Sequence, residues 1–246
     1  MDATQRSDQF RGSGHSSVTR RPVPVAPSFL RSSHSPSSRY QHIDMDHDTL
    51  FPTRIETDRL LLERLCHDNV GLQEYYRICS NDEAIDEVTE YVTWSPHETL
   101  KETKEYIDTV ESEWNDGDGA SYLIRPVSPD TDEIVGAAGL SIDWDRRAGT
   151  LGTWLRKPYW GRGYSGERAT ALISLAFEQL DLDVIEVSHH PDNDKSQRAI
   201  EKYIEAHGGR RDGVLRNGLV YQDGTVVDIA HYSITRDEYR EAAETE

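Results

Sequence analysis

The sequence Trp160-Gly161-Arg162-Gly163-Tyr164-Ser165-Gly166-Glu167 lies between a strand-like run, residues 150–156, and an amphipathic helix. Three glycines and a serine at a strand-to-helix turn leave backbone N–H groups uncovered at the start of the helix. The helix dipole favours the same charge as these amides, so the turn predicts an anion-binding site. One acid, Glu167, stands against four basic residues in and beside the turn: Arg156, Lys157, Arg162 and Arg168. A basic, glycine-lined turn in an acidic chain predicts a phosphate-bearing ligand.

The same glycines allow other interpretations. Gly161, Gly163 and Gly166 satisfy the G-x-G-x-x-G spacing of dinucleotide-binding folds. A Rossmann domain needs several further parallel strands, whereas hairpin signals fill the rest of this chain. A P-loop needs Lys and then Ser or Thr where Glu167 and Arg168 stand. Two alternatives stay open: a nucleotide-dependent oxidoreductase, and a turn that uses glycine only to reverse direction.

The composition describes an acidic chain. It has 246 residues, a formal net charge of −18, and only 5 Lys against 22 Arg. An acidic, lysine-poor surface is typical of salt-adapted proteins, because screening removes the self-repulsion of its charges. A merely acidic cytosolic protein is the alternative. The charge argues against nonspecific binding to nucleic acid.

The cysteines and the N-terminal segment predict the cellular setting. Cys66 and Cys79 lack metal-ligand or redox spacing, so we expect reduced thiols in a cytoplasmic protein. No apolar run approaches the roughly 18 residues of a membrane span, and no signal peptide is visible. Residues 1–44 are rich in Ser, Arg, Pro and His, which predicts disorder or a mis-annotated extension with Met45 as the true start. A transit peptide is the alternative for this segment.

Hydrophobic periodicity and turn signals predict the elements of one α/β (α+β) domain at residues 45–240. A helix starts at Ser95, with serine as cap and proline at the first position. Asn217-Gly218 marks a turn. The expected strands are 59–65, 121–127, 133–142, 150–156, 184–188 and 226–234, and the other expected helices begin near 68, 166 and 196. This order mixes antiparallel hairpins with one βαβ unit around the glycine turn.

Together these segments resemble the GCN5-related N-acetyltransferase (GNAT) superfamily, most like its ribosomal-protein alanine acetyltransferase (RimJ/RimL) branch. The resemblance covers residues 54–236, and its matching segments are 57–65, 152–155, 158–167 and 191–196, followed by Glu201-Lys202. It implies a mixed, mostly antiparallel sheet of six to seven strands, flanked by about four helices. It also implies direct transfer of the acetyl group of acetyl-CoA to a primary amine.

The resemblance implies a cofactor site around the glycine turn. Backbone amides of the turn would hold the pyrophosphate, and a strand amide would polarise the thioester carbonyl. Ser196 would stabilise the leaving thiolate. Ile200 stands where many relatives have a tyrosine that protonates this thiolate, and Tyr203, one turn away, is the second candidate. The implied cofactor-binding residues are Trp154, Leu155, Arg156, Gly161, Arg162, Gly163, Tyr164, Ser165, Gly166, Asn193 and Ser196.

This chain departs from the family pattern at two places. Ser165 stands where relatives have Gly or Ala, and serine is small enough that we expect binding to survive. The helix after Lys202 runs on to His207-Gly208-Gly209 instead of ending in Gly-Phe, which leaves the acceptor-side wall undefined.

The catalytic base and the acceptor are less specific. An amine acceptor arrives as an ammonium and must lose a proton to a carboxylate or a histidine. The expected catalytic residues are Ser196, Glu186, His189 and Asp143, while Glu87 and Glu90 stay open as bases. Trp94 and Trp144 are candidates for the acceptor groove. His189-His190 and Asp192 lack the surroundings of a metal site, so no metal is expected.

A protein N-terminus of ribosomal-protein type, another N-terminus, or a small amine fits as acceptor. The alternative function is a non-catalytic acetyl-CoA-binding sensor. We expect a monomer or a homodimer without nucleic-acid or membrane partners.

Overall fold

The computed structural model describes residues 42–44, 49–128 and 132–245. These residues all belong to one compact unit, which lies within Ser38–Glu246. Most of the predicted extension, residues 1–41, therefore lies outside the described residues. The last three residues of the predicted extension, His42–Asp44, are described and form a short strand that pairs with Arg54–Glu56. In the described part, no helix is long and apolar enough to cross a membrane.

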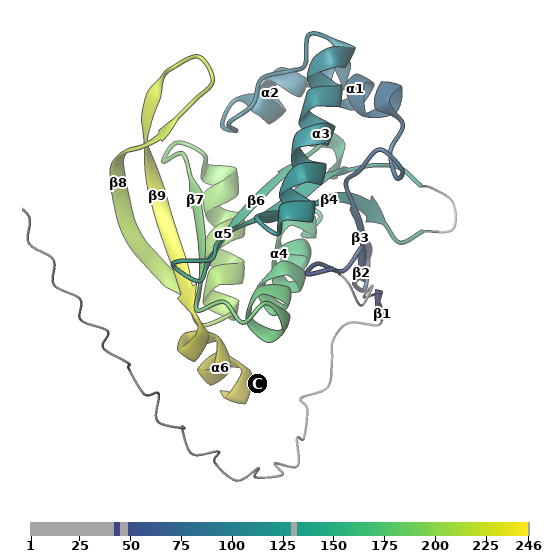
Figure 1. Ribbon diagram of the computed structural model, residues 1–246. Coiled ribbons are helices and arrows are strands. Elements are labelled where there is room, and N and C mark those ends of the chain that lie inside the picture. The colour runs from purple at the N-terminus through teal and green to yellow at the C-terminus, as the bar shows by residue number, and fades with distance from the viewer. Residues whose placement is uncertain (1–41, 45–48, 129–131, 246) are drawn as a thin grey trace, which may run out of the picture. The chain divides into compact units, whose positions relative to one another are not determined.

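A mixed sheet forms the centre of the domain (Figure 1). Its described strands are ordered β1-β2-β3-β4-β5-β6-β7-β9-β8, and only the β6–β7 pair is parallel. The strands are β1 (His42–Asp44), β2 (Arg54–Glu56), β3 (Leu60–Arg64), β4 (Gly119–Pro126), β5 (Gly136–Asp143), β6 (Ala148–Leu155), β7 (Val184–His189), β8 (Arg210–Val220) and β9 (Val226–Thr235).

Helices cover the sheet on both faces (Figure 1). The described helices are α1 (Leu72–Asn81), α2 (Ile85–Thr89), α3 (Leu100–Asp116), α4 (Tyr164–Ser174), α5 (Asp194–Ala206) and α6 (Arg236–Thr245). A 3-10 turn, η1 (Lys157–Tyr159), precedes α4, and a π-helical turn, η2 (Leu175–Gln179), extends it. The predicted mixed, mostly antiparallel α/β fold is confirmed. The described sheet has nine strands rather than six or seven, because it includes the short β1 and β2 at one edge.

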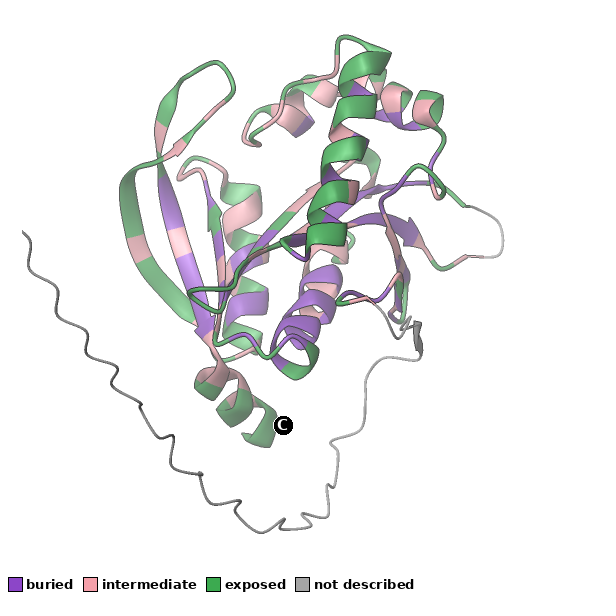
Figure 2. Cartoon of the chain, viewed as in Figure 1, coloured by how far each residue is buried: buried purple, intermediate pink, exposed green. Residues whose placement is uncertain are grey.

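Side-chain alternation along the strands builds two cores (Figure 2). Tyr122 of β4 faces a core shared with α4 and α5, and its neighbour Leu123 faces a core shared with α1 and α3. Val187 of β7 joins the first core, whereas Trp154 of β6 packs against the second. The two faces of the sheet thus carry different helices, so adjacent residues of one strand reach different surroundings.

Two local predictions differ from the structure. The helix expected to start at Ser95 starts at Leu100, because Thr99 and Glu102 form a capping box: the Glu102 N–H donates to Thr99 Oγ1 and the Glu98 N–H to Glu102 Oε2. Asn217-Gly218 lies inside β8 at a register shift against β9, rather than in a turn. The Asn217 φ of 52° shows that the residue tolerates the left-handed conformation that such a bulge requires.

Candidate active site

The glycine turn leaves the start of α4 open. Gly161 and Gly163 have φ values of 75° and 81°, a left-handed conformation that favours glycine. Gly163 is the N-cap, and no described side chain caps this end of the helix. A Cβ added at Gly161 or Gly166 would meet no heavy atom within 4 Å. There is therefore free space beside Gly161 and Gly166 at the start of α4, whereas Arg59 lies 3.3 Å from the place of a Cβ at Gly163.

An ion pair from Arg59, the residue before β3, fastens the turn. The Arg59 side chain donates from Nε to Glu167 Oε2 at 2.7 Å and from Nη1 to the Arg162 carbonyl at 2.9 Å. The other Glu167 oxygen accepts from the Thr57 hydroxyl at 2.6 Å and the Arg59 N–H at 2.8 Å. Sequence reasoning missed this clamp, although Arg59 lies in the opening segment that resembles the family.

Acids from distant segments pair with two of the four basic residues near the turn. Arg156 forms a bidentate pair with Asp82 at 2.7 and 2.8 Å and also bonds to Glu133. Lys157 pairs with Glu87, and the hydrogen bond from this lysine is the largest cause that lowers the pKa of Glu87 to about 2.

The folded protein therefore exposes less positive charge around the turn than the local sequence predicts. Arg168 is buried, and Arg162 stacks over the ring of Tyr159, 4.9 Å from its centroid. Of the four predicted basic groups, Arg162 is the one that we assign to a phosphate.

Strand β6, which we call the cofactor strand because the predicted cofactor residues lie at its end, directs two backbone N–H groups into a gap in the sheet. Arg156 donates its N–H to the Val135 carbonyl at 2.9 Å, and backbone groups alternate along an antiparallel strand. The N–H groups of Thr153 and Leu155 therefore point away from β5, toward the β7 side. Pairing between β6 and β7 ends at Thr150, so both amides lie beyond the paired region. Thr153 was not among the predicted cofactor-binding residues. Two residues that were, Trp154 and Arg156, direct their amides toward β5 because of the alternation.

The start of α5 lies beside the glycine turn. Asn193 caps this helix by accepting from the Ser196 N–H at 3.0 Å, and Ser196 is half-buried in the first turn. Lys195 Nζ lies 4.2 Å from the centre of the Trp160 ring and 2.8 Å from Glu87 Oε1. The Lys195–Trp160 contact thus links the start of α5, which carries Asn193 and Ser196, to the glycine turn.

The predicted base candidates lie at different places. Glu186 stands opposite Thr150, the last paired residue of β6, on the sheet face opposite α4 and α5. Arg146 Nη2 donates to Glu186 Oε1 at 2.6 Å, and Arg146 Nη1 donates to Glu186 Oε2 at 3.4 Å. Asp143 accepts from the Arg146 N–H and closes the β5–β6 turn, at the end of β6 far from the glycine turn.

His189 is buried on the opposite face of β7 from Glu186. Its Nδ1 donates to the His190 carbonyl at 2.8 Å, and its Nε2 lies 3.2 Å from the Tyr232 hydroxyl. Both ring nitrogens therefore already have protein partners.

Only one of the two predicted groove tryptophans lies near the cofactor strand. Trp94 packs edge-on against Trp154 of β6, with ring centroids 5.3 Å apart. His97 packs against Trp94 at 5.8 Å. Trp144 instead donates its indole N–H to the Gly117 carbonyl, so it ties the β5–β6 turn to the end of α3.

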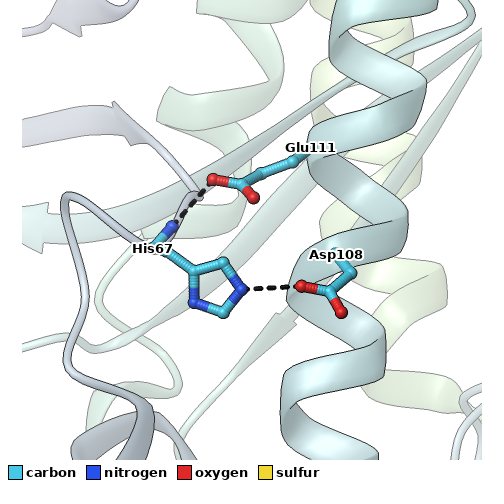
Figure 3. A group of neighbouring side chains, drawn as sticks. All are labelled: His67, Asp108 and Glu111. Carbon is cyan, nitrogen blue, oxygen red and sulfur yellow. Dashed lines mark hydrogen bonds and ion pairs between the residues drawn. The ribbon is translucent and has the colours of Figure 1, made fainter.

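His67, Asp108 and Glu111 form a group with metal-ligand chemistry on α3 and the loop before α1 (Figure 3). His67 Nε2 lies 2.8 Å from Asp108 Oδ1, and the His67 N–H donates to Glu111 Oε1 at 3.0 Å. Lys104 Nζ also contacts Asp108 at 2.6 Å, and this bond is the largest cause that lowers the pKa of that carboxyl. The Lys104 ammonium already pairs with the Asp108 carboxylate. The hydrogen bonds of His67 to Asp108 and Glu111 anchor the loop before α1 to α3.

The sequence is similar to that of known acetyltransferases. A family model described as "Acetyltransferase (GNAT) domain" matches residues 59–203. The "Uncharacterized N-acetyltransferase p20" of Bacillus licheniformis is 26% identical over 154 residues, which are 62% of this chain and 83% of that protein. The "Putative ribosomal N-acetyltransferase YdaF" of Bacillus subtilis is 31% identical over 99 residues, 40% of this chain and 51% of that protein.

A solved structure shares the fold at lower identity. The Microcin C7 self immunity acetyltransferase MccE, in complex with acetyl-CoA and AMP, superposes with a TM-score of 0.64 at 18% identity, covering 76% of this chain and 98% of that one. With the match to residues 59–203, the chain belongs to the acetyltransferase (GNAT) family and is an acetyl-CoA-dependent N-acetyltransferase.

Proposed function

We propose that the protein transfers the acetyl group of acetyl-CoA to the α-amine of a protein N-terminus, of the ribosomal-protein type. The observation that carries the site is the gap beyond Thr150 and Glu186, into which two amides of β6 point, together with the uncapped start of α4. The acceptor class is supported by the relative whose name describes a ribosomal N-acetyltransferase. The net charge of −18 also favours a cationic acceptor.

Backbone groups bind the co-substrate in this proposal. The amides from Arg162 to Gly166 hold the pyrophosphate, because they combine uncovered N–H groups with the positive end of the α4 dipole. The Leu155 amide bonds to the pantetheine arm as an added strand would. The Thr153 amide donates to the thioester carbonyl and then to the oxyanion that forms from it.

The start of α5 receives the leaving group. Asn193 fixes the first turn of this helix through the Ser196 N–H. The Ser196 hydroxyl donates to the thiolate as the carbon–sulfur bond breaks, and the thiolate then takes up a proton.

We assign the proton acceptor to Glu186, through water. Its carboxylate lies at the point where β6 and β7 separate, on the face that also carries Trp154. Asp143 ends β5 at the opposite end of β6 from the glycine turn, and His189 is buried with partners at both nitrogens, so neither takes this role. The Arg146 pair positions Glu186, and Glu186 Oε2, which accepts only the longer bond of 3.4 Å from Arg146, serves the water.

Thiol release from acetyl-CoA by the full-length protein in molar salt tests the function. The acceptors are peptides that begin with Ala, Ser or Met, together with a polyamine and an aminoglycoside. We expect release with N-terminal peptides, and blocking the peptide α-amine should abolish it. The variant Glu186→Gln should lose roughly 10²- to 10⁴-fold in kcat, the range for a lost general base. Release with only a small amine would refute the acceptor class, and thermal stabilisation by acetyl-CoA without any release would favour the sensor.

A further inference from the structure

Arg168 is the largest fully buried side chain among the described residues, with 2% of its surface exposed. It lies in α4, one turn after the glycine turn. Its neighbours on the buried side of this helix, Ala169 and Leu172, are apolar. An apolar residue of similar volume would fill this place without the desolvation penalty of a buried charge, so packing does not explain a guanidinium here.

The guanidinium has few partners. Nη1 donates to the Gly152 carbonyl at 3.3 Å, and Nε has no hydrogen-bond partner among the described residues. The group lies over the Tyr203 ring, 5.9 Å from its centroid, and Tyr203 is the polar side chain that interacts with it. Burial lowers the pKa of Arg168, while Tyr203 raises it. An arginine keeps its proton in proteins, so α4 carries a buried positive charge.

The Gly152 carbonyl is linked to the site through its peptide bond. Gly152 C=O and Thr153 N–H belong to one peptide unit, which is trans because the described chain has no cis bond. The two groups therefore point in opposite directions. Arg168 binds the carbonyl end, while the N–H end faces the gap between β6 and β7.

We propose that Arg168 is a positioning residue that strengthens the Thr153 N–H as a hydrogen-bond donor to the thioester carbonyl. The inference rests on the proposed role of Thr153. A cation at the carbonyl oxygen draws electron density from the peptide nitrogen, so the N–H becomes a stronger donor. The charge also fixes the peptide plane before the substrate binds. This preorganisation is the reason why an oxyanion-binding group stabilises the transition state.

The test uses full-length protein and acetyl-CoA labelled with ¹³C at the thioester carbonyl. Isotope-edited difference infrared spectroscopy reports the stretching frequency of the bound carbonyl, and it needs no acceptor. We expect the wild-type frequency to lie below that of free acetyl-CoA. In Arg168→Met the frequency should return toward the free value, and Arg168→Lys should lie between the two because it keeps the charge.

Kinetics with an accepted peptide provide the second readout. Removal of a whole oxyanion donor lowers kcat by about 10²- to 10³-fold, so loss of its polarisation alone should lower kcat by roughly tenfold. The KM for acetyl-CoA should change by less than about twofold, because the pyrophosphate amides are untouched. Arg236→Met is the matched control, since Arg236 also donates to a backbone carbonyl, that of Phe177, on a different part of the fold.

The outcomes separate the two proposals. If wild-type acetyl-CoA shows a lowered carbonyl frequency that Arg168→Met leaves unchanged, the role of Arg168 is overturned and the site stands. If wild-type protein neither lowers the carbonyl frequency of bound acetyl-CoA nor releases thiol, the proposed role of Thr153 is refuted, and with it the proposed function. A fall in kcat together with a matching rise in KM and a lower Tm, at unchanged frequency, would show a structural role only.

Discussion

Gly161→Ala separates the conformational role of the turn from its role in binding. The Gly161 φ is 75°, and an added Cβ meets nothing within 4 Å. The free protein should therefore lose only the strain of a left-handed alanine, about 1–2 kcal/mol. For a domain of this size, each kcal/mol lowers Tm by about 2–4 °C. Urea unfolding without ligand measures this part.

Ligand binding should respond more strongly. If the pyrophosphate occupies the open space at the turn, the new methyl group competes with it, and we expect Kd for acetyl-CoA to rise at least about tenfold, or 1.4 kcal/mol. At a concentration of 100 times the wild-type Kd, stabilisation by ligand should then fall from about 2.7 to about 1.4 kcal/mol. Calorimetric titration measures Kd directly.

Gly224→Ala is the matched control. Gly224 has a φ of 84° and equal free space, but it lies in the β8–β9 turn. Both variants should lose similar stability, and only Gly161→Ala should lose affinity. Equal Kd values for the two variants would refute the assignment of the glycine turn as the phosphate site.

Three further predictions concern stability. Glu167→Gln should destabilise the protein by about 1–2 kcal/mol in urea unfolding, because it removes the charge that holds Arg59; an unchanged midpoint would contradict the clamp. Burial lowers the pKa of His97, so the unfolded state binds more protons, and stability should decline as pH falls below about 6.5. His97→Gln should flatten this part of the Tm–pH curve, and parallel curves would exclude His97. Tm should rise from dilute to molar salt because of the net charge of −18; a salt-independent Tm would exclude salt adaptation.

Local features of the site were predictable from the sequence. The glycine turn, the amphipathic helix after it and the cap at Asn193 follow from residues near one another in the chain. Backbone conformation and capping depend on a few neighbours, so such patterns keep their meaning in any tertiary context. The same locality misplaced one helix start, because Ser95-Pro96 and Thr99 offered competing caps one turn apart.

Features that depend on register were not predictable. Thr153 and Leu155, rather than Trp154 and Arg156, direct their amides to the gap, and this choice follows from which residue of β6 meets Val135. A shift of one residue would exchange the two sets. Register depends on the whole sheet, and the sequence of β6 alone does not contain it.

The sequence by itself determined the family, the order of most elements and the position of the glycine turn that we propose binds phosphate, because these rest on short segments with strong local preferences. Only the tertiary structure decided the charges around that turn. It brought Asp82 to Arg156 and Glu87 to Lys157, and it buried Arg168 beneath the cofactor strand. Electrostatic interactions depend on distance in space and on burial, neither of which separation along the chain reveals.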